Sequence, residues 1–207
     1  MEEVNVGDIY CYSDKSFLSP DSYKSKRRTS GLGIVVSSLY GVIRVVNFNA
    51  HNKGKKYKFM EGNCMTDYID VTSSANGDAA KRDLAGLKNS YYISQSSKIE
   101  GHEFSWCTKR YLNDIEYTYR DESDWYLPSL GELERLRGTA SKILGIMEDC
   151  KLTNYTLYDL LKELPHLISS TQKSDTMMYS LDMRTGKALE VLKDSEVYGV
   201  SFKRVSP

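Results

Sequence analysis

Several features that define common protein classes are missing from this 207-residue sequence. Basic and acidic residues number 28 each, so the net charge of zero favours neither a nucleic acid nor an acidic membrane surface as partner. No segment approaches the roughly 18 apolar residues of a membrane span. Residues 1–5 are acidic and lack an apolar stretch, so no signal peptide is predicted in this sequence. The compartment and the oligomeric state stay open.

Cysteine is scarce and widely spaced. No two cysteines have the C-x-x-C spacing of a zinc site, so we expect no bound metal. Four cysteines permit three disulfide pairings, but the spacing is also typical of buried thiols, which is the interpretation we prefer. The four residues are Cys11, Cys64, Cys107 and Cys150.

Catalytic signatures are also absent. The sequence has no G-x-S-x-G elbow, no H-E-x-x-H pair and no phosphate-binding Walker loop. The three histidines are His51, His102 and His166, and none has a partner at the spacing of a metal site or a catalytic triad. We therefore expect no catalytic residue, no cofactor and no enzymatic activity.

Tyrosine, by contrast, is abundant, with 16 residues against five phenylalanines and two tryptophans. The tyrosine ring buries apolar area while its hydroxyl stays hydrated, which suits a recognition surface. Tyrosine-rich β structure without any ligand has the same composition. Both interpretations stay open at this point.

The most informative stretch is WYLPSLGELERL, residues 125–136. Its aromatic and apolar start suits a short buried strand, which the proline ends. The serine and the glutamate three residues later have the spacing of a capping box, and the apolar residues that follow recur at the spacing of one helix face. We therefore predict a buried, capped helix here. The structural motif comprises Trp125, Leu127, Pro128, Ser129, Glu132 and Leu133.

The remaining elements follow from periodicity and turn signals. The expected strands are residues 6–12, 31–38, 42–48, 177–183, 188–192 and 197–205. Further helices are expected over residues 78–88, 103–117 and 157–164, and the polar residues 13–30 are expected to form a turn and a loop. This order predicts an α+β fold with a mostly antiparallel sheet, hairpins and two or three packed helices. Residues 1–75 would form an N-terminal β-hairpin region and residues 76–207 the core, within one continuous domain.

The stretch at residues 125–136 resembles the signature W-x-L-P-(S/T)-x-x-E-L-x-x-L of a bacterial C-type-lectin-like family, named for the C-terminal domain of the collagen-like adhesin Lcl. It is also similar to variable proteins of diversity-generating retroelements. A second similarity is the S-S-T run of Ser169, Ser170 and Thr171, where the family has Y-W-S-S-T-E. Ile168 replaces the family's tryptophan and Gln172 its glutamate, so we expect another side chain, such as Trp106, to fill the core there.

The resemblance implies a C-type-lectin-like fold and a non-enzymatic surface or secreted module that binds a carbohydrate or a protein partner. The E-P-N, Q-P-D and W-N-D motifs of calcium-dependent lectins are absent, so binding would be independent of metal. In such a fold the site lies near the C-terminal hairpins. The candidate ligand-binding residues are Ser174, Asp175, Met177, Tyr179, Arg184 and Tyr198. The alternatives are a structural or assembly protein, such as a fibre or envelope component, and an enzyme.

Overall fold

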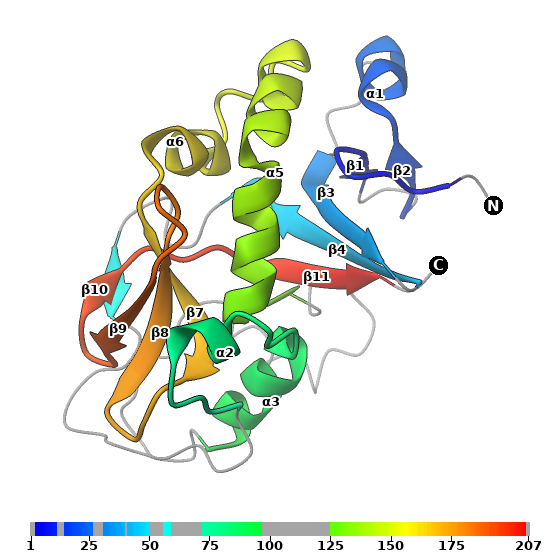
Figure 1. Ribbon diagram of the computed structural model, residues 1–207. Coiled ribbons are helices and arrows are strands. Elements are labelled where there is room, and N and C mark those ends of the chain that lie inside the picture. The colour runs from blue at the N-terminus through cyan, green and yellow to red at the C-terminus, as the bar shows by residue number, and fades with distance from the viewer. Residues whose placement is uncertain are drawn as a thin grey trace.

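The chain folds around one long helix that lies between two antiparallel sheets (Figure 1). This computed structural model describes residues 3–11, 15–26, 31–39, 41–49, 56–58, 72–96 and 125–205. Helix α5 (Leu130–Asp149) contacts strands of both sheets. The predicted α+β fold is confirmed. None of the helices in the described ranges is both long and apolar enough to cross a bilayer.

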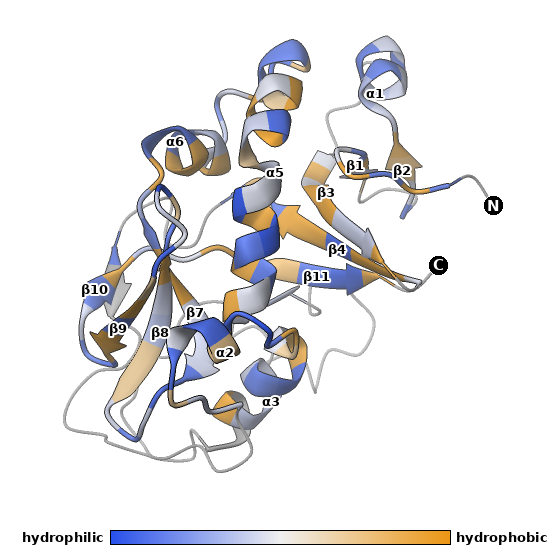
Figure 2. Cartoon of the chain, viewed as in Figure 1, coloured by the Kyte–Doolittle hydropathy of each residue, from blue (hydrophilic) through white to orange (hydrophobic). Residues whose placement is uncertain are grey.

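The larger sheet has six strands and joins both ends of the chain. Its order is β2 (Phe17–Leu18), β1 (Ile9–Cys11), β3 (Gly31–Leu39), β4 (Val42–Asn47), β11 (Phe202–Val205) and β6 (Trp125–Tyr126). Strands β3 and β4 bury side chains on both faces, and β4 is largely orange in Figure 2. The sheet therefore takes strands from both of the regions expected from the sequence, residues 1–75 and residues 76–207.

The second sheet is a three-stranded meander that places the C-terminal hairpins. Strands β7 (His166–Gln172), β8 (Met177–Asp182) and β9 (Ala188–Leu192) pair in that order, so the predicted hairpin is confirmed. The prediction of a single strand over residues 197–205 was wrong. Strand β10 (Glu196–Val197) pairs with β5 (Tyr57–Lys58), whereas β11 joins the six-stranded sheet. The break arises because the carbonyl of Tyr198 accepts the amide of Ile168, 2.9 Å away, instead of continuing the ladder.

The other helices are α1 (Pro20–Lys26), α2 (Gly77–Ala80), α3 (Gly86–Ser96) and α6 (Thr156–Glu163). Helix α6 confirms its prediction, whereas α1 lies where a loop was expected. The prediction of a single helix over residues 78–88 was wrong. The Asp83 carboxylate accepts a hydrogen bond from the amide of Ala85 at 2.8 Å, and a new helix begins after this turn. The predicted helix at residues 103–117, with Trp106 and Cys107, lies outside the described residues, as do Cys64, His51 and His102. Cys11 is buried and Cys150 is half-buried.

A buried carboxylate closes the start of α5. Glu132 is 1% exposed, and its Oε1 accepts Arg44 Nε at 2.8 Å and the Tyr126 hydroxyl at 3.0 Å. Its Oε2 accepts the backbone amide of Ser129 at 3.0 Å, so the predicted capping box is present. Burial raises the pKa of the Glu132 carboxyl, while Arg44 and Ser129 lower it. The charge of Arg44 therefore offsets the cost of burying this carboxylate.

The two motifs that the sequence singled out meet at the same place. Thr171 Oγ1 accepts the amide of Leu130, one of the N-terminal amides of α5 that lack a partner within the helix, at 2.9 Å. The amide of Ser170 donates to the carbonyl of Pro128 at 2.8 Å. Thr171 also donates to Asp83 at 2.7 Å. The S-S-T run is therefore a buried polar layer that fixes β7 against α5.

Replacing Glu132 removes the partner of a buried guanidinium. We expect Glu132→Ala to lower the free energy of unfolding by about 3–5 kcal/mol, because Arg44 is left buried without a counter-charge. Urea titration followed by tryptophan fluorescence measures this loss. The control is Glu134→Ala on the same helix, whose ion pairs with Lys81 and Arg137 are partly exposed and should contribute no more than about 1 kcal/mol. Equal losses in the two variants would contradict this role for the buried pair.

Candidate functional site

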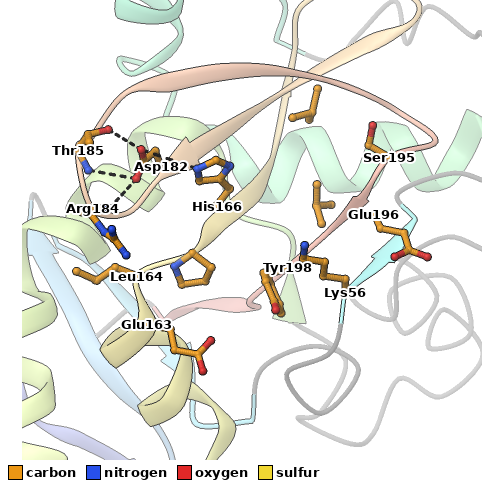
Figure 3. Close-up of a pocket in the computed structure, with 13 residues that line it drawn as sticks. Lys56, Glu163, Leu164, His166, Asp182, Arg184, Thr185, Ser195, Glu196 and Tyr198 are labelled. Carbon is orange, nitrogen blue, oxygen red and sulfur yellow. Dashed lines mark hydrogen bonds and ion pairs between the residues drawn. The ribbon is translucent and has the colours of Figure 1, made fainter.

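A cavity of about 610 Å³ opens where β7 begins and β8 ends. Its lining comes from the C-terminal end of α6, the turn between β8 and β9, strand β10, and Lys56 just before β5 (Figure 3). This volume lies within the usual range for small-ligand sites. Arg184 and Tyr198, two of the candidate residues from the sequence, line this cavity.

One carboxylate holds the turn that forms one wall of the cavity. Asp182 Oδ1 accepts the amides of Arg184 at 2.8 Å and Thr185 at 3.2 Å, and its Oδ2 accepts the Thr185 hydroxyl at 2.7 Å. The hydrogen bond from the Thr185 hydroxyl is the main cause that lowers the pKa of the Asp182 carboxyl. Gly186 follows with a φ of 73°, a left-handed conformation that favours glycine. The turn therefore presents Arg184 on a defined backbone.

The opposite wall begins at the C-terminal end of α6, where the chain turns sharply. Leu164 ends this helix in the left-handed conformation, with a φ of 50°, and Pro165 leads into β7. Residues other than glycine seldom adopt this conformation. His166 then pairs in register with Asp182, and its Nε2 lies 3.8 Å from Asp182 Oδ2. This ion pair is present only when the imidazole is protonated, and 54% of the His166 side chain is exposed.

The third wall presents an aromatic ring. Tyr198 follows β10 and is half-buried, and the Lys56 ammonium lies 5.5 Å from the centre of its ring, a cation–π distance. Glu196 on β10 and Glu163 on α6 add exposed carboxylates to the rim. The cavity thus combines an aromatic face with both donors and acceptors.

The structure divides the six candidate residues among three places. Ser174, Asp175 and Met177 lie at the turn between β7 and β8, at the other end of β8 from the cavity. Tyr179 is 1% exposed, and its hydroxyl donates to the carbonyl of Ser74 at 3.0 Å, so its ring packs in the core. Only Arg184 and Tyr198 meet at one cavity.

Sequence reasoning missed most of the lining of this cavity, including His166, Asp182 and Thr185. The Asp-x-Arg-Thr-Gly spacing was a local signal, because an aspartate before a Thr-Gly turn often accepts the backbone amides that follow. The approach of His166 had no such signal, because it depends on the register between β7 and β8.

The lining of the cavity carries both cationic and anionic side chains. None of the described residues that line it is a cysteine, and His166 is too far from Asp182 for a hydrogen bond. Within the described ranges, no group of three or more histidine, cysteine, aspartate or glutamate side chains could hold a metal ion. Arg184 and Lys56 supply donors, and the glutamates supply acceptors.

Comparison with known proteins gives a fold match alone. No family model and no curated protein matches the chain. A crystal structure of a fimbrial protein from Bacteroides ovatus ATCC 8483 is similar, with a TM-score of 0.67 and 18% sequence identity. The match covers 97% of this chain and 48% of that one, so the chain spans about half the length of that fimbrial protein.

The hydrogen bonds to Asp182 make the stability of the turn dependent on pH. A carboxyl with a lowered pKa stabilises the fold above the unfolded pKa, about 3.9, and this stabilisation is lost as the pH falls through the folded pKa. We expect Asp182→Asn to reduce the free energy of unfolding by about 1 kcal/mol at pH 7, with the difference shrinking below about pH 4. Urea titrations across this pH range measure it.

The control is Asp175→Asn at the exposed turn between β7 and β8. It should stay close to the unsubstituted protein at every pH. A difference between Asp182→Asn and the unsubstituted protein that persists or grows at low pH would contradict the assigned role of Asp182.

Proposed function

We propose that this chain is a non-enzymatic binding module of a surface protein, and that it holds a carbohydrate in the cavity lined by Arg184 and Tyr198. The observation on which this depends is the combination of an aromatic ring with fixed hydrogen-bonding groups around one opening. The fold match to a fimbrial protein supports a surface setting. The resemblance of residues 125–136 to the lectin-like family is in line with the same proposal.

Carbohydrate chemistry suits this lining. A sugar ring offers a C–H face that can lie on an aromatic side chain, and hydroxyls that both donate and accept hydrogen bonds. Tyr198 supplies the aromatic surface, Arg184 donors, and Glu163 and Glu196 acceptors. Because the hydrogen bonds to Asp182 hold the backbone of Arg184, less ordering is needed when a ligand binds.

Binding would not require a metal ion. Both oxygens of Asp182 already accept hydrogen bonds from the β8–β9 turn, which leaves this carboxylate poorly placed to coordinate calcium. The His166–Asp182 separation of 3.8 Å supports a non-catalytic role, since a general base needs an orienting hydrogen bond.

A glycan array tests the proposal. We expect a specific signal that EDTA does not change, and about a tenfold loss of affinity in Arg184→Ala and in Tyr198→Ala. Arg184 is exposed, so its variant should fold normally. The matched control is Tyr91→Ala on α3, a tyrosine that is 40% exposed and lies outside the cavity. No signal on any glycan, or loss of signal with EDTA, would refute the proposal.

A second candidate function is assembly into a fibre. It is favoured by the fold match, in which this chain covers about half of a fimbrial protein, and by the exposed side chain of Leu192 on β9. Strand β9 pairs with β8 on one side, and within the described residues no other strand is its ladder partner. An edge strand of this kind can add a strand from another chain.

The assembly candidate predicts that the molar mass rises with protein concentration. Leu192→Glu should shift the equilibrium toward monomer, because a charge on the edge strand opposes pairing. Leu39→Glu on β3 is the control, since Leu39 is similarly exposed, at 42% against 47%. Light scattering after size exclusion measures the mass, and a constant monomer mass at all concentrations would exclude this candidate.

A further inference from the structure

We infer that the cavity of Arg184 and Tyr198 selects saccharides that carry a free amino group. This inference rests on the proposed function and adds the class of sugar. Its basis is an ammonium of the protein that already lies against the aromatic wall. The Lys56 ammonium is 5.5 Å from the centre of the Tyr198 ring. Because the face of an aromatic ring attracts cations, this ring also offers a place for the ammonium of a ligand.

Two carboxylates at the same opening have no basic partner among the described residues. Glu163 at the C-terminal end of α6 and Glu196 on β10 are exposed and line the cavity. Neither takes part in an ion pair within the part of the chain that the structure describes. An ammonium that enters the opening therefore gains a favourable interaction with negative charges that the protein itself leaves uncompensated.

The charges of the lining are divided between its walls. Figure 3 shows Arg184 on the opposite side of the cavity from Glu196 and Lys56. A ligand that matches this division carries a positive group toward Tyr198 and Glu196, and hydrogen-bond acceptors toward Arg184. An amino sugar has both, since its hydroxyls accept from the guanidinium. An acidic sugar would instead bring a like charge to the two glutamates, which opposes its binding.

The rigidity of a sugar favours it over the other common carrier of an ammonium. A lysine side chain of a partner protein holds its ammonium on a flexible stem, and ordering that stem opposes binding. In an amino sugar the amine is attached directly to a rigid ring that also bears hydroxyls. A cavity of about 610 Å³ with mixed donors and acceptors suits such a ring. A lysine peptide is therefore the alternative that the experiment must exclude.

Calorimetry with two glucosamine tetramers tests the inference. One tetramer has free amino groups, and in the other every amino group is acetylated and therefore neutral. The measurement is made at about pH 6, below the range of about 7.7–8.0 in which α-amino groups titrate, so that the free amines are largely protonated. We expect the free-amine tetramer to bind about tenfold more tightly than the acetylated one.

Two variants at the cavity should act in opposite directions. Glu196→Gln should weaken binding of the free-amine tetramer about fivefold and leave the acetylated one within about twofold, because only an ammonium interacts with the lost charge. Lys56→Gln should strengthen binding of the free-amine tetramer, because it removes the competing ammonium from the Tyr198 ring. The control is Glu3→Gln, an exposed glutamate outside this cavity that loses the same charge. It should change neither affinity by more than about twofold.

Four results would overturn the inference: no advantage of the free-amine tetramer, equal weakening in Glu196→Gln and the control, weaker binding of that tetramer in Lys56→Gln, or tighter binding of a trilysine peptide than of that tetramer. The two proposals fail separately. If neutral glycans bind and the free-amine tetramer has no advantage, the selectivity is wrong and the proposed function stands. If no glycan binds at all, both are wrong.

Discussion

The ion pair between Glu132 and Arg44 is the constraint on which the arrangement of the sheets depends. A carboxylate this deeply buried is tolerable only if its oxygens are fully engaged, and three donors engage them: Arg44 on β4, Tyr126 on β6 and the backbone amide of Ser129 before α5. Burial beside Glu132 also raises the pKa of Tyr126 well above its usual value, so its phenol remains a donor. Because the partners lie on different elements, α5 cannot slide or rotate without leaving a charge unpaired. The pair therefore fixes the helix against the six-stranded sheet.

The same helix end fixes the second sheet. Thr171 accepts the amide of Leu130 and donates to Asp83, so the polar S-S-T run of β7 replaces the water that would otherwise hydrate the start of α5. Ile168 lies beside this polar layer and is fully buried, so its side chain fills the core at this position. Since β7 and β8 run from this fixed layer to the cavity, the position of Arg184 and His166 follows from it.

Local signals predicted most of the elements, and non-local contacts decided the rest. Ser129 and Glu132 could be recognised as a capping box from their spacing, but that Glu132 also pairs with Arg44 depends on a contact 88 residues away. The break between α2 and α3 was missed for a similar reason. Asp83 is turned inward by Asn89 and Thr171, and no local pattern distinguishes this aspartate from a solvated helical one. For the cavity, Arg184 and Tyr198 were predicted, whereas His166 depended on strand register that periodicity alone does not supply.

The turn between β8 and β9 borders two cavities, and this has a physical consequence. Arg184 and Thr185 line one cavity, while Lys187 and Ala188 line the other. Hydrogen bonds to Asp182 hold the turn on one side. On the other side, the guanidinium of Arg137 packs closely against Gly186 and leaves the turn little room to move. A ligand that moved this turn at one cavity would also move the backbone that lines the other, and this would couple binding at the two cavities in both directions. If the turn instead stays rigid, as its hydrogen bonds favour, the two cavities are independent of each other. The effect of binding at one cavity on the backbone of the other then measures how firmly Asp182 holds the turn.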